Sequence, residues 1–230
     1  MRAAVPFAIL FTAMVFSTNS LEAQSSNEPA LPDAAARGDI AAVRALTAER
    51  AQNKVETKIE IDARDAQGRT ALLIATHRND VEMARVLIDA GADVNAKDAI
   101  QDSPYLYAAA EGRLDILRMT LAAGADLKSV NRYGGTGLIP AAHHGHVDTV
   151  RELLRTGIAV DHVNRLGWTA LLEAIILGDG GAAHTEIVHL LIAAKADVNL
   201  ADSQGVSPLA HAERRGYRDM AMILRAAGAR

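Results

Sequence analysis

The chain repeats itself with a period of 33 residues. Asp65, Asp98, Asn131 and Asn164 open four consecutive segments at that interval, and Asp202 opens a further segment after 38 residues. A fixed period of this length is typical of stacked-repeat proteins, in which each unit buries its apolar face against its neighbours. Because such a solenoid usually works by presenting an extended binding surface, the period directs the search for function toward a surface and away from an enclosed catalytic pocket.

The unit at residues 65–97 predicts a turn, a short helix, a second turn and a longer helix. Gly68 permits the opening turn, and Thr70 stands where a hydroxyl can cap the first helix. Apolar residues then recur at helical spacing in two blocks, and Gly91 ends the second block. Since neither helix could bury its apolar face alone, the neighbouring units must cover it, and the sequence predicts an all-helical stack.

These units resemble the ankyrin repeat, whose usual form runs D-x-x-G-x-T-P-L-H-x-A-A, then G-H, then I-V-x-x-L-L and G-A-D-V-N. The second unit carries Gly68-Arg69-Thr70-Ala71-Leu72 and Gly91-Ala92-Asp93-Val94-Asn95, and the fifth carries Gly167-Trp168-Thr169-Ala170-Leu171 and Ala196-Asp197-Val198-Asn199. The resemblance implies an all-α solenoid of about six helix-turn-helix units with short β-turn or hairpin loops. It places one repeat domain at 31–230, with units at about 31–64, 65–97, 98–130, 131–163, 164–201 and 202–230.

The chain departs from the family pattern at one recurring position. The family usually has a His after Pro-Leu, and that imidazole ties the helix start to the neighbouring loop. The residues found at this position here are Leu73, Leu106, Ile139, Leu172 and Ala210. The substitution predicts different hydrogen bonding at the helix starts and somewhat softer stability.

Two insertions interrupt the period. One of about eight residues falls within the charged stretch 49–60, and one of five falls near residues 179–183, between the two helices of the fifth unit. The glycine-rich run at 178–181 predicts a flexible loop there.

The first 23 residues have the layout of a secretory signal peptide. Arg2 gives a positive start, an apolar run occupies residues 3–16, and a polar stretch ends on the small residue Ala23. The run is shorter than the roughly 20 residues of an ordinary membrane span, and an uncleaved anchor is the alternative. We expect cleavage after Ala23, a linker at 24–30, a periplasmic location and no stable membrane insertion once the signal is removed.

Composition excludes several classes of function. The net charge of −4 offers no basic stripe for nucleic acid, and the absence of Cys rules out disulfides, thiolate metal ligands and Cys nucleophiles. The run Gly134-Gly135-Thr136-Gly137 lacks the Lys of a phosphate-binding loop. Asp93, Asp126 and Asp197 recur with the repeat, which explains them as loop hydrogen bonders. We expect no enzyme, no catalytic residue and no cofactor.

A group of histidines is the candidate metal site: His143, His144 and His146, with His162 and His184. His146 and His184 occupy the Gly-His position that the repeat itself favours, and the first two end a short helix facing solvent. No carboxylate stands at a fixed ligand spacing from them. The repeat therefore explains the histidines without a metal ion, and we expect no metal site.

The surface that the repeat leaves free is the stronger candidate. In ankyrin proteins the turn tips and the exposed side of the first helices form a concave face that meets partners, and Trp, Tyr and Arg dominate interface energetics. Carried over by position, the expected partner-binding residues are Arg69, Gln101, Tyr107, Arg132, Tyr133, His143, His144, Arg165, Leu166 and Trp168. Arg78, Glu111, Glu173 and Leu177 would lie beside them on the helices.

The sequence therefore predicts an exported, monomeric module that binds a protein partner and no nucleic acid. The chain is similar to small bacterial periplasmic ankyrin proteins, some of which are associated with catalases and peroxide resistance. That similarity implies support of a periplasmic partner enzyme or of a stress response. Two alternatives stay open: an immunity or inhibitor protein against an exported toxin, and a metal- or peroxide-linked accessory protein built on the histidines.

Overall fold

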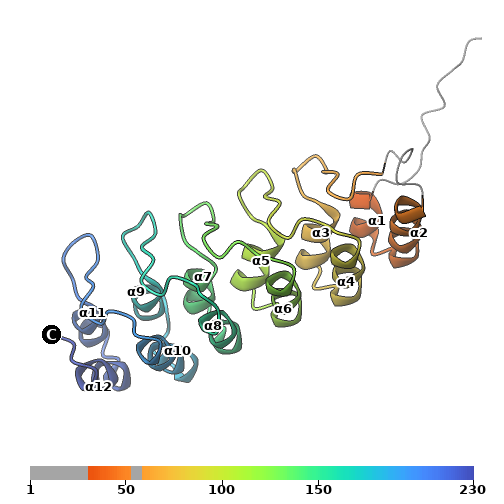
Figure 1. The fold of residues 1–230 in the computed structure, drawn as a ribbon. Helices are drawn as coiled ribbons and strands as arrows, with labels where there is room; N and C mark the ends of the chain where they lie inside the picture. The colour runs from red at the N-terminus through yellow and green to blue at the C-terminus, as the bar shows by residue number, and fades with distance from the viewer. Residues whose placement is uncertain (1–30, 53–58) are drawn as a thin grey trace, which may run out of the picture.

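The protein is a row of paired helices (Figure 1). The computed structural model describes residues 31–52 and 59–230, and within them twelve helices follow one another. The first helices of the pairs are α1 (Leu31–Arg37), α3 (Ala71–His77), α5 (Pro104–Ala110), α7 (Leu138–His143), α9 (Ala170–Ile176) and α11 (Pro208–Arg214). The second helices are α2 (Ile40–Gln52), α4 (Val81–Asp89), α6 (Leu114–Ala122), α8 (Val147–Leu154), α10 (Ala182–Ala193) and α12 (Arg218–Ala226).

The pairs stack side by side, and long loops project from one edge of the stack as a series of hairpin-shaped tips (Figure 1). Within the described part of the chain there is no β-strand, and the one β-bridge joins Arg64 to Thr70. The all-helical solenoid expected from the 33-residue period is thus confirmed. No helix of residues 31–52 and 59–230 is long and apolar enough to cross a membrane. The expected signal peptide (1–23), the linker (24–30) and most of the first insertion (53–58) lie outside the described residues.

Hydroxyl caps hold the starts of the first helices. The side-chain oxygens of Thr70, Ser103, Thr169 and Ser207 each accept a bond from the backbone N–H three residues later, at 3.2–3.3 Å. These caps satisfy a backbone donor within the same unit. They give each of these helix starts a hydrogen bond of its own where the usual His is missing. In the fourth unit the hydroxyl of Thr136 has no partner among the described residues.

The core is one continuous apolar layer that runs from Leu31 to Leu224 between the two rows of helices. Most of it is Ala, Leu, Ile and Val, which lets short helices approach closely. Tyr105 is fully buried in the row where other units have Leu, such as Leu72 and Leu171. Its hydroxyl lies beside Gly137 of the next unit, where the absence of a Cβ leaves room for the larger side chain.

A ladder of side-chain acceptors joins the loops of neighbouring units. One residue in each of four units accepts a bond from a backbone N–H of the following unit, at 2.8–3.0 Å: Asp62, Asn95, Asp161 and Asn199. Lys128 occupies the equivalent position of the third unit and offers no acceptor oxygen. Among the described residues, the joint between the third and fourth units therefore lacks this rung.

The recurring aspartates act within their own loops. Asp93, Asp126 and Asp197 each accept a bond from the backbone N–H two residues later, at 2.8–2.9 Å. They are loop hydrogen bonders, as the sequence predicts. Their recurrence follows from the recurring turn.

The second insertion differs from expectation. Asp179 accepts bonds from the Gly181 N–H at 2.8 Å and from His184 Nδ1 at 2.9 Å, and the Tyr217 hydroxyl donates to the Gly178 carbonyl at 2.9 Å. Ala182 and the residue after it belong to α10. The loop expected to be flexible is therefore tied down at several points, because the insertion reaches an aromatic side chain of the next unit.

Candidate functional site

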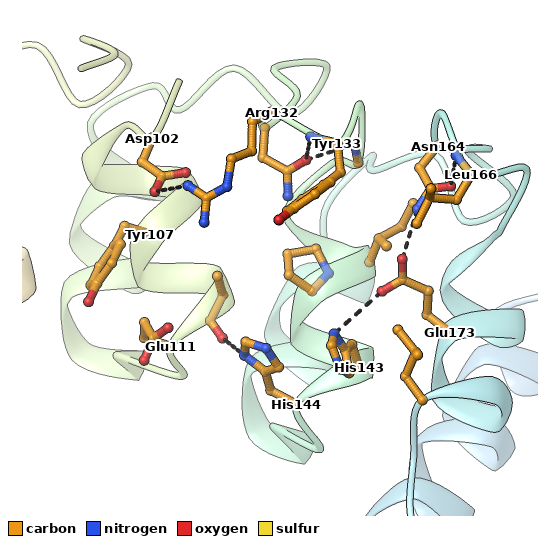
Figure 2. A pocket seen from close by; sticks show the side chains of 16 residues that line it. Asp102, Tyr107, Glu111, Arg132, Tyr133, His143, His144, Asn164, Leu166 and Glu173 are labelled. Atoms are coloured by element: carbon orange, nitrogen blue, oxygen red, sulfur yellow. Dashed lines mark hydrogen bonds and ion pairs between the residues drawn. The ribbon is translucent and has the colours of Figure 1, made fainter. Parts of the chain in front are cut away.

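A groove of about 360 Å³ lies on the first-helix side of the third, fourth and fifth units (Figure 2). Its walls come from α5, α7 and α9 and from the loop tip that precedes each of them. Its volume falls within the range of about 300–1,000 Å³ that is usual for ligand-sized sites. Six of the residues expected on the partner face line it: Tyr107, Arg132, Tyr133, His143, His144 and Leu166.

The other four expected residues lie outside the groove and shape the tips. Arg69 pairs with Asp65 of its own turn at 2.7 Å. Arg165 Nη1 donates to the Arg132 carbonyl at 3.0 Å, which links neighbouring tips. Gln101 is an exposed tip residue with a positive φ of 70°. Trp168 is half-buried, and its backbone N–H donates to Asn164 Oδ1 at 3.0 Å.

The repeat register explains which helical side chains face the groove. One position of the first helix recurs on this side of the stack, and its residues are Ile74, Tyr107, Pro140, Glu173 and His211. Tyr107 stacks on His77 of the preceding unit, with 3.9 Å between ring centroids. The stacking fixes the tyrosine ring at one end of the groove.

Glu173 is the exceptional member of that column. It is 6% exposed, and Asn164 Nδ2 donates to its Oε1 at 2.7 Å. Its Oε2 lies 3.8 Å from His143 Nδ1, which is too long for a hydrogen bond. Burial raises the pKa of Glu173 to about 7, and the Asn164 hydrogen bond offsets part of that rise. Burial also lowers the pKa of His143, with His144 and His184 adding to the effect.

In two units the first residue of the turn is hydrogen-bonded to the helix residue nine positions later, and its side chain determines which residue type fits there. In the fifth unit Asn164 uses its oxygen for two backbone N–H groups and its amide nitrogen for Glu173. In the last unit Asp202 binds two backbone N–H groups in the same way, and its second oxygen meets His211 Nε2 at 2.8 Å. The pairs are complementary, because an aspartate at 164 would set two carboxylates against each other.

The groove also holds a fixed cation. Arg132 Nη1 pairs with Asp102 Oδ2 at 3.0 Å, and its guanidinium lies 5.4 Å from the centroid of the Tyr133 ring. Burial raises the pKa of Asp102, while the nearby Arg132 pulls it down. Figure 2 shows this pair on the opposite side of the groove from Glu173. Arg132 therefore has a carboxylate partner of its own.

Exposed apolar side chains form the rim. Tyr133 is 55% exposed, Leu166 48% and Leu177 42%, and all three line the groove. Apolar surface gathered around a concave site is typical of a place where another molecule docks. The sequence indicated the tips and helix faces, but it missed Asp102 and Asn131 as lining residues and gave no sign that Glu173 is buried.

Three of the histidines are hydrogen-bonded to neighbouring backbone. His144 Nδ1 bonds to the Ala110 carbonyl at 2.7 Å, His184 Nε2 to the His143 carbonyl at 2.8 Å, and His162 Nε2 to the Gly134 carbonyl at 2.7 Å. Each of these bonds occupies one ring nitrogen, which donates its N–H to the carbonyl. Among the residues that the structure describes, no group of three or more His, Asp or Glu side chains is placed to hold an ion.

Comparison with known proteins agrees with this architecture. The sequence model of the family described as ankyrin repeats (three copies) matches residues 8–98 and 105–199. An ankyrin repeat domain from Acinetobacter baumannii AYE is 57% identical with a TM-score of 0.81, covering 87% of this chain and 98% of that one. The ankyrin repeat protein EF0377 is 41% identical with a TM-score of 0.80, covering 86% and 97%.

A curated relative matches over a shorter stretch. The putative ankyrin repeat protein YahD of Escherichia coli K12 is 46% identical over 57 residues, which is 25% of this chain. The match spans 28% of that protein's length. Family model, solved structures and repeat geometry agree, and the chain belongs to the ankyrin repeat family.

Proposed function

We propose that this protein is a monomeric binding module whose groove receives a protein partner. Ankyrin repeats form a non-enzymatic scaffold for protein–protein interaction. The observation that carries the proposal is the concave groove with an exposed rim of Tyr133, Leu166 and Leu177. Tyrosine is among the residue types that contribute most to interfaces, and exposed apolar surface around a recess marks a place where another protein docks.

The proposal places the protein in the periplasm, where it would support a partner enzyme or a stress response. Its support is the leader-like layout of residues 1–23. We expect the protein in the periplasmic fraction of its host to begin at Gln24, which intact-mass measurement would show. A chain that retains residues 1–23 in the cytoplasm would contradict export.

Truncating the rim should weaken partner capture. We expect the double variant Tyr133→Ala/Leu166→Ala to bind captured proteins at least about tenfold more weakly, because both side chains lose their buried contact area. The measurement is affinity capture from a periplasmic extract, followed by mass spectrometry and by titration of each captured protein. The identities separate a partner enzyme from an exported toxin.

Met222→Ala is the matched control. Met222 lies on α12 away from the groove and is 62% exposed, so it tests whether any exposed apolar residue has the same effect. Capture that survives the double variant at full strength, or that falls equally with Met222→Ala, would place the interface elsewhere.

A further inference from the structure

The floor of the groove carries a carboxylate that the fold does not need. Glu173 stands in a column where the preceding units have Ile74, Tyr107 and Pro140, so the repeat stacks without an acid there. It is 6% exposed and aimed into the groove (Figure 2). Burying a carboxylate is unfavourable unless a cation or donors compensate. Asn164 supplies one donor, to Oε1.

We infer that the groove receives an arginine side chain of the protein partner. Its guanidinium binds Oε2 of Glu173, and its aliphatic stem packs against Tyr133 and Leu166. The inference rests on the proposed function, because it assigns the chemistry of the partner at the same groove. It adds the group that is recognised and the residue that recognises it.

The charge of the groove favours a cation. Asp102, Glu111 and Glu173 contribute carboxylates, and Arg132 is already paired with Asp102. His143 does not neutralise Glu173, because burial lowers the pKa of its imidazole and the nearest approach is 3.8 Å. The buried carboxylate of Glu173 and the wall carboxylate of Glu111 are therefore the ones that an incoming cationic side chain meets.

The walls favour arginine over lysine. A guanidinium is planar and weakly hydrated, and it stacks on aromatic rings, whereas an ammonium group keeps its water more strongly. The Arg132 guanidinium already lies over the Tyr133 ring, 5.4 Å from the ring centroid, and Tyr133 is 55% exposed. A recessed carboxylate beside an aromatic wall is thus better matched by a flat, delocalised cation.

Binding of a cation should be coupled to loss of a proton. Burial raises the pKa of Glu173 to about 7, so the unliganded carboxyl is partly protonated at neutral pH. The groups around it are Asn164 from the tip and His143 from α7, with Asp102, Glu111, Arg132 and His144 elsewhere in the groove. Because the guanidinium binds the ionised form of Glu173, the affinity for arginine should increase as the pH is raised through 7 and decrease as the pH is lowered below 7.

The test is an NMR titration with two capped amino acids. N-acetyl-arginine methylamide should shift the backbone amide signals of Tyr133, Leu166 and Glu173 saturably at about pH 8. N-acetyl-citrulline methylamide has the same shape without the charge, and we expect it to bind at least about tenfold more weakly, roughly 1.4 kcal/mol. Glu173→Gln should remove the preference for arginine, and Glu82→Gln, on α4, should leave it unchanged.

Four results would overturn the inference: no saturable shift with arginine, equal binding of arginine and citrulline, an undiminished arginine preference in Glu173→Gln, or tighter binding of N-acetyl-lysine methylamide. Circular dichroism of each variant establishes that it is folded. The titration needs no natural partner, so its failure leaves the rim-truncation experiment standing. Conversely, the rim-truncation experiment can succeed or fail whether or not the groove recognises arginine.

Discussion

Glu173→Gln should stabilise the protein by about 3 kcal/mol at pH 8 and by less than about 1 kcal/mol at pH 5. Glutamine keeps the shape of the side chain and can still accept the Asn164 amide bond, which is 2.7 Å long in the native protein. What it removes is the charge that burial disfavours. The size of the effect follows from the displacement of the pKa from 4.5 to about 7.

The sign follows from proton linkage. The folded protein holds the Glu173 proton up to about pH 7, whereas the unfolded chain releases it near 4.5. Between these values the folded state binds more protons, so the contribution of Glu173 is fully present below the unfolded pKa and is lost as pH rises through the folded pKa. The gain from the glutamine variant should therefore appear between about pH 5 and 8.

Urea unfolding followed by circular dichroism, at several pH values between 5 and 8, would measure this difference. Glu82→Gln is the control, because the Glu82 side chain is 67% exposed and pairs with Arg44 on the surface. Such a pair contributes at most about 1 kcal/mol. Parallel pH profiles for the native protein and Glu173→Gln would show that the carboxyl titrates normally.

Gly137→Ala should destabilise the protein by about 2–3 kcal/mol. A Cβ at this position would lie 3.0 Å from both the Ala109 Cβ and the Tyr105 Oη, and both neighbours are fully buried. Closely packed interiors respond to an added methyl by shifting side chains or backbone. The backbone itself does not require glycine, since φ is −56°.

The same substitution should be tolerated once the tyrosine is reduced. In Tyr105→Leu the hydroxyl and part of the ring are gone, which reproduces the Ala-Leu pairing of other units, such as Ala170 with Leu138. Gly137→Ala should then cost less than about 1 kcal/mol, because the close contact with the Tyr105 hydroxyl is gone and only the contact with the Ala109 Cβ remains. A double-mutant cycle by urea unfolding should give a coupling of about 2 kcal/mol or more, and additive effects would contradict the proposed fit.

Local sequence signals predicted the elements well. Thr70 was expected to cap the first helix of its unit, and its hydroxyl does so in the structure. Asp197 was identified as a loop hydrogen bonder and is one. These interactions join residues two or three positions apart, so the order of residue types is enough to define them.

The site was predicted less completely. The repeat register placed Tyr107, Tyr133 and Leu166 on the concave side, and they line the groove. The same register gave Trp168 equal weight, yet the tryptophan is half-buried outside the groove. Position within a repeat determines the face of a side chain, but neighbouring units determine how much of it stays exposed.

The stacked helical architecture follows from the amino-acid order alone, because a period of 33 residues and its caps and turns are local properties of the chain. Packing between units sets the depth at which Glu173 lies, its distance of 3.8 Å from His143, and the fit of Tyr105 to Gly137. Each of these depends on contacts between separate units, 30 or more residues apart for the two pairs. Burial, and with it the pKa of a carboxyl, is a property of the packed stack.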